Sequence, residues 1–357
     1  MVAPTPTPFT PNDNPDYDLL AGNIEKWMQT GLSGFVVGSY GGEEFHLSSK
    51  EKIRCVEVVS QAHKGKRFVI AGIDTPSPTS ALSQAEEYAS AGADMIRVRI
   101  PDIPGDKSDR GVVEYFDQVV SMSPLPVIVI HQPKEAMSVN ATPDEILAVT
   151  SMDNVYAYIM SLNFRWECRI PSFIHESTQL WTCNGTLLLP GAMIGAEGAC
   201  LFFANWAPDI CREIISLVKE GSYSEARDIQ SKVSHADFIG MDKGVAALKS
   251  GLNMLGYETT VPRRPTRPLN SDEESELREA FKTAGILLRY NGLISSYTIS
   301  TFKHFVDRIP QGYCGINCYH YILIAMFASS MYFCGPFVCD FYAVWMIGLP
   351  RVSHGLC

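Results

Sequence analysis

The side chains best suited to chemistry in this sequence stand where short apolar segments end. The first group is the segment GSYGGE, in which Ser39 and Tyr40 carry hydroxyls and Gly41 and Gly42 carry backbone N–H groups free of side-chain cover. Such donors can bind a carboxylate or a carbonyl oxygen. The alternative is a glycine-rich turn in which the serine is structural, and the sequence leaves both open.

The second group, His131 and Gln132, ends the apolar run PVIVI. A histidine suits general acid–base catalysis because its unperturbed pKa of about 6.5 lies near a working pH. We therefore take His131 and Tyr40 as candidate catalytic residues and Gln132 as a candidate substrate contact. The alternative for His131 is a structural hydrogen bond to a neighbouring loop.

Two further segments carry candidate binding residues. Arg97 and Arg99 alternate in an apolar run, so on a strand they share one face. Arg99 is a candidate for binding an anionic substrate, and a helix-facing salt bridge is the alternative. Asn184 is a candidate contact in the segment TCNG. A reactive thiolate at its neighbour Cys183 would need a cation beside it, and none is evident.

Glu43, Glu44 and His46 resemble a set of metal ligands. With the leucine that follows, they fit better a loop that caps the next helix at Ser48 or Ser49. We therefore predict no metal and no cofactor.

Short β-type runs alternate with amphipathic helical stretches, which predicts a parallel (β/α)8 TIM barrel with a C-terminal helical extension. The eight expected strands are Val2–Thr7, Gly34–Gly38, Arg67–Ile73, Met95–Ile100, Pro126–His131, Val155–Met160, Thr178–Thr182 and Ala199–Phe203. The expected helices are Tyr17–Thr30, Ser49–His63, Ser80–Ala91, Gly111–Met122, Pro143–Thr150, Pro208–Glu220, Ser222–Ala236, Met241–Met254 and Ser271–Gly285. No nucleotide-binding fingerprint follows the first strand.

Composition changes divide the chain into an expected barrel at 1–220, a three-helix region at 221–290 and an apolar tail at 291–357. Within the tail, residues 309–350 are apolar enough to contact a membrane. Gly335-Pro336 and Asp340 interrupt the run, which argues against a membrane anchor. We favour a translated intron or shifted reading frame, with a buried or partner-facing segment as the next alternative.

The net charge of −10 argues against nucleic acid as a partner. The N-terminus lacks the pattern of a signal peptide, and the scattered cysteines of the barrel suit a reducing compartment, so we expect a cytoplasmic protein. Cysteine pairs within 314–339 have spacings seen in zinc sites, but their apolar surroundings argue against one.

Several segments, in order, resemble the dihydrodipicolinate synthase / N-acetylneuraminate lyase family of class I aldolases, over about residues 3–288. They are PTPTPF, GFVVGSYGGEEFHLSSKEK, LPVIVIHQP, LWTCNGTLLLPGAMIGAEGACLFF, RRPTRPL and LREAFKTAGIL. The loop and helix start GS…HLSSKEK are most similar to fungal members that act on 2-keto-3-deoxy sugar acids. The resemblance implies a dimer or tetramer of barrels.

In that family a lysine on the sixth strand forms a Schiff base with a 2-oxo acid. The segment NVYAYIMS is similar to the family's sixth strand, and it places Ile159 at the lysine position. The family's proton-relay tyrosine matches Ile130, and the arginine that often follows the fifth strand matches Glu135. The tyrosine pair after the fourth strand matches Asp102 and Ile103. The covalent mechanism is therefore not expected.

Two functions remain open. We favour a lyase-type enzyme (aldolase, dehydratase or cyclase) that acts on a small carbonyl, oxo-acid-like or polyketide-like substrate without a Schiff base, in fungal specialised metabolism. The alternative is an inactive relative that binds a ligand or assembles with active subunits. Tyr156 and Tyr158, which alternate with Ile159, are expected to pack against helices.

Overall fold

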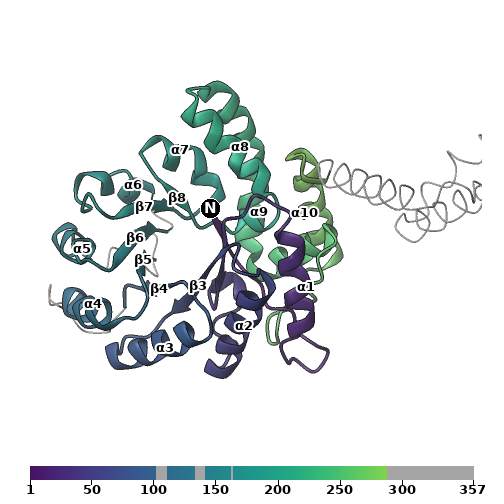
Figure 1. Cartoon of the computed structure of the whole chain (residues 1–357). Helices are drawn as coiled ribbons and strands as arrows, with labels where there is room; N and C mark the ends of the chain where they lie inside the picture. Colours follow the sequence, from purple (N-terminus) through teal and green to yellow (C-terminus); the bar gives the residue numbers. More distant parts are fainter. Residues whose placement is uncertain (102–110, 133–140, 162–163, 288–357) are drawn as a thin grey trace, which may run out of the picture. The chain divides into compact units, whose positions relative to one another are not determined.

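The computed structural model describes residues 1–101, 111–132, 141–161 and 164–287 (Figure 1). Its eight strands pair in sequence order, and every pair is parallel. They are β1 (Val2–Pro4), β2 (Gly34–Val37), β3 (Phe68–Ile73), β4 (Met95–Arg99), β5 (Val127–His131), β6 (Val155–Met160), β7 (Gln179–Thr182) and β8 (Gly198–Ala199). A parallel bridge between Val2 and Cys200 joins the first strand to the chain that follows the last. The predicted TIM barrel is confirmed.

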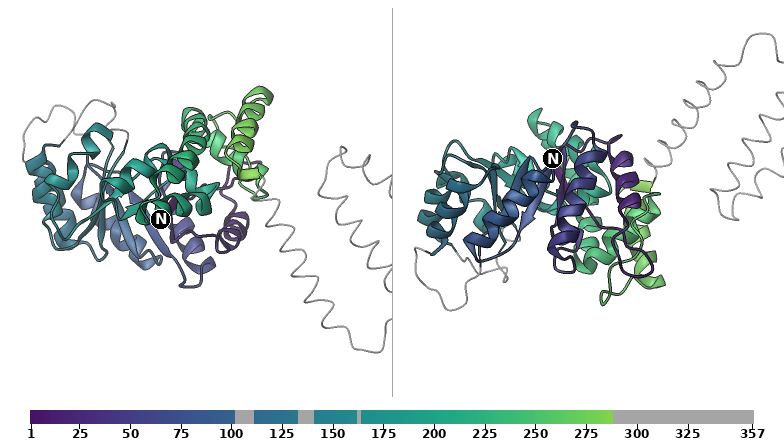
Figure 2. Two further views of the ribbon diagram at one scale, coloured as in Figure 1. Left: turned by 90° about the horizontal axis from the view of Figure 1, so that it is seen from above. Right: turned by 60° about the horizontal axis from the view of Figure 1, so that its bottom comes forward.

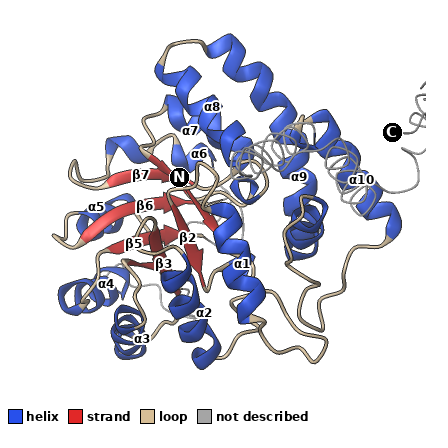
Figure 3. Ribbon diagram, turned by 45° about the vertical axis from the view of Figure 1, so that its right-hand side comes forward, coloured by secondary structure: helices blue, strands red, loops and turns tan. Residues whose placement is uncertain are grey.

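Helices surround the strands, as Figure 2 and Figure 3 show. They are α1 (Tyr17–Trp27), α2 (Ser49–Ala62), α3 (Pro78–Ser90), α4 (Gly111–Met122), α5 (Pro143–Thr150), α6 (Phe164–Glu167), α7 (Leu188–Met193), α8 (Pro208–Lys219), α9 (Tyr223–Met254) and α10 (Ser271–Thr283). Short 3₁₀ turns add η1 (Tyr40–Gly42), η2 (Ile170–Ser172), η3 (Gly185–Leu187) and η4 (Phe203–Asn205). No helix in the described ranges is long and apolar enough to cross a bilayer.

The sequence left two candidates for the N-cap of helix α2, Ser48 and Ser49. The Ser48 side chain accepts a hydrogen bond from the Glu51 backbone N–H, and the Glu51 carboxylate accepts one from the Ser48 backbone. This reciprocal capping box satisfies N–H groups that the first turn would otherwise leave unpaired. Ser48 is therefore the cap, and Ser49 is the first residue of the helix.

Four elements differ from expectation. The two helices expected at Ser222–Ala236 and Met241–Met254 are present within α9, but the kink between them lies at Gly244, with φ 58° and ψ −139°, and not between Ala236 and Met241. Strand β8 has two residues, because the chain turns into η4 from Phe203. Helices α6 and α7 were not predicted. The expectations for residues 291–357 lie outside the described residues.

The strands separate two hydrophobic layers. One layer, which we call the lumen core, fills the inside of the barrel; it consists of Val2, Val36, Ile70, Met95, Ile128, Ile130, Ala157, Ile159, Trp181 and Cys200. The other lies between the strands and the surrounding helices. On β5, Ile128 and Ile130 belong to the lumen core, whereas Val127 and Val129 face the helices. This alternation fixes which strand residues can reach the mouth of the barrel.

Candidate active site

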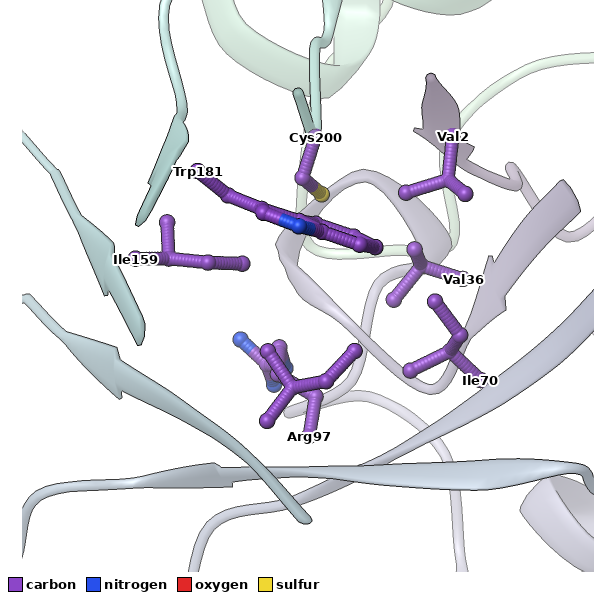
Figure 4. Close-up of a pocket in the computed structure, with 8 residues that line it drawn as sticks. Val2, Val36, Ile70, Arg97, Ile159, Trp181 and Cys200 are labelled. Atoms are coloured by element: carbon purple, nitrogen blue, oxygen red, sulfur yellow. The ribbon is translucent and has the colours of Figure 1, made fainter. Parts of the chain in front are cut away.

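The lumen beneath the mouth is apolar and filled. Ile159 lies in the lumen core, is 1% exposed and approaches the indole of Trp181 from the neighbouring strand (Figure 4). The space between the lumen side chains has no room for a water molecule. Its lining consists of Val2, Val36, Ile70, Arg97, Ile128, Ile159, Trp181 and Cys200, with no lysine among them. The side chain at the position matched to the family's lysine therefore faces inward, but it is a packed hydrocarbon.

Four charged side chains meet at the carboxyl ends of β2, β3 and β4. Glu44 follows η1, Asp74 follows the last residue of β3, and Arg97 and Arg99 lie on β4 with Met95 of the lumen core on the same face. We call these four residues the mouth cluster. TIM barrels carry their active sites at this end of the strands, so the cluster lies where chemistry is expected.

Each arginine of the mouth cluster contacts both of its carboxylates. Arg97 Nη2 lies 2.8 Å from Asp74 Oδ2 and 3.0 Å from Glu44 Oε2. Arg99 Nη2 lies 2.7 Å from Glu44 Oε1, and Arg99 Nε donates to Asp74 Oδ1. Arg99 Nη1 also donates to Gln132 Oε1 at 2.8 Å, so the structure brings two of the predicted binding residues together. Each carboxylate bridges both arginines, which fixes all four side chains.

A glycine makes room for the Arg97 guanidinium. A Cβ atom at Gly72 would lie 2.9 Å from Arg97 Nη2 and 2.0 Å from the carbonyl oxygen of Gly38 on the neighbouring strand end. Both approaches are closer than ordinary contacts, so a side chain at this position would have to displace them.

The two carboxyls of the cluster have opposite proton affinities. Burial raises the pKa of Glu44 to about 7, against the attraction of Arg97, and a hydrogen bond with Asp74 adds to the rise. Burial would raise the pKa of Asp74 too, but Arg97, Arg99 and the hydrogen bond from Glu44 outweigh it and hold that pKa well below its usual value. Near neutral pH, Glu44 can therefore gain or lose a proton while Asp74 stays ionised, which is how neighbouring carboxyls divide acid–base roles.

Ser39 directly precedes η1 (Tyr40–Gly42), and polar groups of this segment form hydrogen bonds within the turn and to the end of β2. The Ser39 hydroxyl lies 3.4 Å from the Val36 carbonyl, and the Gly42 N–H donates to the Ser39 carbonyl at 2.8 Å. The Gly42 N–H is thus not free for a substrate oxygen, contrary to its expected role. The Tyr40 hydroxyl lies against the kink of α9, 2.6 Å from where a Cβ of Gly244 would stand. Gly41 packs on Pro4.

His131 does not face the lumen. It shares the face of Val127 and Val129, is fully buried, and its Nδ1 lies 2.6 Å from the hydroxyl of Tyr158 on β6. The Trp166 ring stands edge-on to it at 6.2 Å. This corrects the expected placement of His131 at the mouth, because strand alternation turns it toward the helices.

The two tyrosines of β6 differ. Tyr158 packs on the helix side, as predicted. Tyr156 instead lies 37% exposed and edge-on to Trp181, with ring centroids 6.2 Å apart.

Glu43 is held by a buried lysine. Lys249 Nζ lies 2.5 Å from Glu43 Oε1 and 4.4 Å from the ring centroid of Phe9, and it donates to the Val261 carbonyl at 3.0 Å. The Arg263 N–H donates to Glu43 Oε2. Burial lowers the pKa of Lys249 to about 8, against the attraction of Glu43. Glu43 and Glu44 are therefore bound to cationic side chains rather than arranged around a common metal position.

Cys183 and Asn184 follow β7, and neither gains a contact within the described residues that supports a role in chemistry. Burial raises the pKa of the Cys183 thiol, which disfavours a reactive thiolate. Asn184 precedes η3, and its carbonyl accepts from the Leu187 N–H while its side chain makes no capping bond.

Sequence reasoning missed two members of the mouth cluster. Glu44 was interpreted as part of a capping loop, and Asp74 was not singled out. The signal for Asp74 was its place directly after an expected strand. Glu44 could not be found from spacing, because the turn of η1 decides that it, rather than Glu43, reaches β4.

A family model described as the dihydrodipicolinate synthetase family matches residues 1–284. A protein named probable mitochondrial 4-hydroxy-2-oxoglutarate aldolase, from Emericella nidulans, is 28% identical over 293 residues, covering 79% of this chain and 93% of the relative. A 4-hydroxy-tetrahydrodipicolinate synthase of Archaeoglobus fulgidus is 24% identical over 283 residues, covering 79% of this chain and 96% of the relative.

Solved structures show the same fold. The dihydrodipicolinate synthase of Cyanidioschyzon merolae, solved with lysine bound, superposes with a TM-score of 0.74 at 22% identity and covers 80% of this chain and 98% of its own. The enzyme of the same name from Aquifex aeolicus gives a TM-score of 0.72 at 24% identity and covers 80% and 97%.

Proposed function

This chain belongs to the dihydrodipicolinate synthetase family, a family of lyase and aldolase type, and from that membership we propose that it makes or breaks a C–C or C–O bond in a small 2-oxo acid without a lysine Schiff base. The name of the Emericella nidulans relative supports an oxo acid as the substrate class. The two arginines of the mouth cluster favour an anionic oxo acid over a neutral polyketide-like compound. A role in fungal specialised metabolism remains part of the proposal.

The observation that carries the proposal is the mouth cluster. Arg99 is its most exposed member, with 21% of the side chain accessible, and it is suited to hold a substrate carboxylate. Glu44, whose pKa of about 7 lies near a working pH, is suited to move the proton.

A retro-aldol cleavage can then proceed without an imine. In the complexes in which Glu44 is ionised, its carboxylate takes the proton of the substrate's 4-hydroxyl, the C3–C4 bond breaks, and an aldehyde leaves. The electron pair becomes the enolate of the remaining 2-oxo acid, which the arginines stabilise. Glu44 returns its proton to C3, so that the protein ends in its starting state.

A second function is favoured by one observation. The four charges of the mouth cluster neutralise each other, and the lumen beneath them is filled. A charge-neutral site of this kind also fits an inactive family member that assembles with active subunits.

Turnover separates the two functions. The protein is incubated with racemic 4-hydroxy-2-oxoglutarate and a panel of related 2-oxo acids, and released oxo acid is measured by mass spectrometry. We expect cleavage that falls about 10²-fold or more in Glu44→Gln, since general acid–base catalysis contributes that much. Glu57→Gln, which changes an exposed pair with Arg54 on α2, should leave the rate unchanged. Absence of turnover on the whole panel would favour the assembly function.

A further inference from the structure

We propose that the mouth cluster is an exchange site for carboxylate ligands, in which the carboxylate of a 2-oxo acid replaces Glu44 on Arg99 and Glu44 takes up one proton as it leaves. The proposal rests on the proposed function for the choice of ligand, but it concerns binding and not turnover.

The geometry offers the ligand a place that a carboxylate already occupies. Arg99 Nη2 lies 2.7 Å from Glu44 Oε1, and the Arg99 side chain is 21% exposed whereas that of Glu44 is 1% exposed. Arg97 lies deeper, with 4% of its side chain exposed. An incoming carboxylate therefore meets Arg99 first. It offers the guanidinium the same charge and the same acceptor geometry as Glu44.

Charge balance explains the proton. Two arginines and two ionised carboxylates sum to zero, so a further anion would leave one uncompensated negative charge in a buried site. Protonation of one carboxyl restores neutrality. Asp74 is held by both arginines and stays ionised, which leaves Glu44 as the acceptor of the proton.

Arg97 carries a spare donor. Its Nε–H is buried and has no hydrogen-bond acceptor within the described part of the chain. Leaving a buried donor unpaired costs about 1–3 kcal/mol. A second oxygen on a bound ligand can supply the missing acceptor. The site as it stands is thus short of one acceptor.

The groups that face the cluster from other elements do not titrate in the range in which Glu44 does. Burial raises the pKa of Tyr88 on α3 and of Tyr115 on α4, which both face Asp74. Burial raises the pKa of Cys200 to about 12 and raises that of Cys183, both of which face Arg97. All four stay protonated near neutral pH, so none of them competes with Glu44 for the proton taken up on binding.

The test is isothermal titration calorimetry with pyruvate, at several pH values from 5.5 to 8.5, in pairs of buffers that differ in ionisation enthalpy. We expect uptake of nearly one proton per pyruvate above pH 8 and almost none below pH 6. The apparent Kd should rise about tenfold per pH unit once the pH exceeds the pKa of Glu44. Hydroxyacetone, which lacks the carboxylate, should bind without proton uptake or not at all.

Variants sharpen the test. Glu44→Gln resembles the protonated state and should bind pyruvate with the low-pH Kd of the wild-type protein at every pH. Arg99→Gln should lose binding at least tenfold, and Glu57→Gln should behave as wild type. Pyruvate binding without proton uptake above pH 8, or no binding at pH 6, would overturn the exchange site. Proton-linked binding without turnover would instead reject the proposed lyase function and keep the site.

Discussion

Lys249 Nζ and Glu43 Oε1 form an ion pair 2.5 Å apart in which neither side chain is more than 1% exposed. The pair joins α9 to the turn after β2, directly before the mouth cluster begins at Glu44. Removing one partner leaves the other charge buried and unpaired, which typically costs 3–5 kcal/mol. We therefore expect Lys249→Met to lower the free energy of unfolding by about that amount, measured by urea denaturation.

The same helix supplies the control. Lys243 pairs with Glu276 at 2.8 Å on the surface, where Glu276 is about half exposed. Lys243→Met should cost no more than about 1 kcal/mol. The double variant Lys249→Met/Glu43→Gln should recover part of the loss, since no charge is left behind. Equal losses at the two lysines would show that burial of the Lys249 pair has no special weight.

Stability should depend on pH through Glu44. Its pKa rises from 4.5 to about 7 on folding, so the folded protein binds more protons than the unfolded chain between these values. Its contribution is fully present below about pH 4.5 and is lost as the pH rises through 7, by up to about 3 kcal/mol. We expect Glu44→Gln to reduce the difference between urea midpoints at pH 5 and pH 8.

The pKa of Glu167 is also raised on folding, so its contribution to the pH dependence of stability has to be measured with a separate variant. Burial raises its pKa to about 7, and it lies on α6, with no ion pair to the mouth cluster among the described residues. Glu167→Gln should flatten the pH dependence by a separate, additive amount. A wild-type slope that survives in Glu44→Gln would contradict the raised pKa of Glu44.

Borohydride trapping should give no adduct. The residues that line the lumen include no lysine, and the amine of Lys249 is enclosed by Glu43, Val261 and Phe9. After treatment with pyruvate and borohydride, intact-mass spectrometry should show the unmodified chain. A family member with the sixth-strand lysine, treated in parallel, should gain the mass of the reduced adduct. An adduct on this protein, at any lysine, would refute a non-covalent mechanism.

His131 should matter for stability rather than for chemistry. Its ring is buried against Tyr158 and Trp166, so His131→Ala should lower Tm by several degrees. The ratio kcat/KM should stay unchanged at temperatures at which the variant is folded. Tyr158→Phe, which removes only the hydroxyl, should cost about 1 kcal/mol. A fall in kcat/KM without a fall in Tm would restore His131 as a catalytic residue.

The barrel could be predicted because its strands are short, apolar and regularly spaced. Seven of the eight strands agree to within three residues at each end, and β8 ends early since the chain folds into η4 after Leu201. Helices α6 and α7 escaped prediction because four and six residues are too few to show a helical period. The expected break within α9 was misplaced by a few residues, since the non-helical backbone that separates its two helices lies at Gly244.

The site could be predicted only where strand alternation decides it. Arg97 and Arg99 were expected to share a face, and both meet Glu44 and Asp74 at the mouth. His131 was misplaced because the sequence does not say which face of β5 is the lumen: Ile128, Val129 and Ile130 are all apolar. The partnership of Glu44 with two arginines depends on long-range geometry, which spacing along the chain does not contain.

The hydrogen atom that serves as the side chain of Gly72 has a consequence for how this protein can change. Any larger residue there would press on the Gly38 carbonyl and on the Arg97 guanidinium at once. A replacement would therefore disturb the exit of one strand and the electrostatics of its neighbour in a single step. Substitutions that change the chemistry of this barrel are thus easier at Arg99 or Gln132, on the solvent side, than at Gly72.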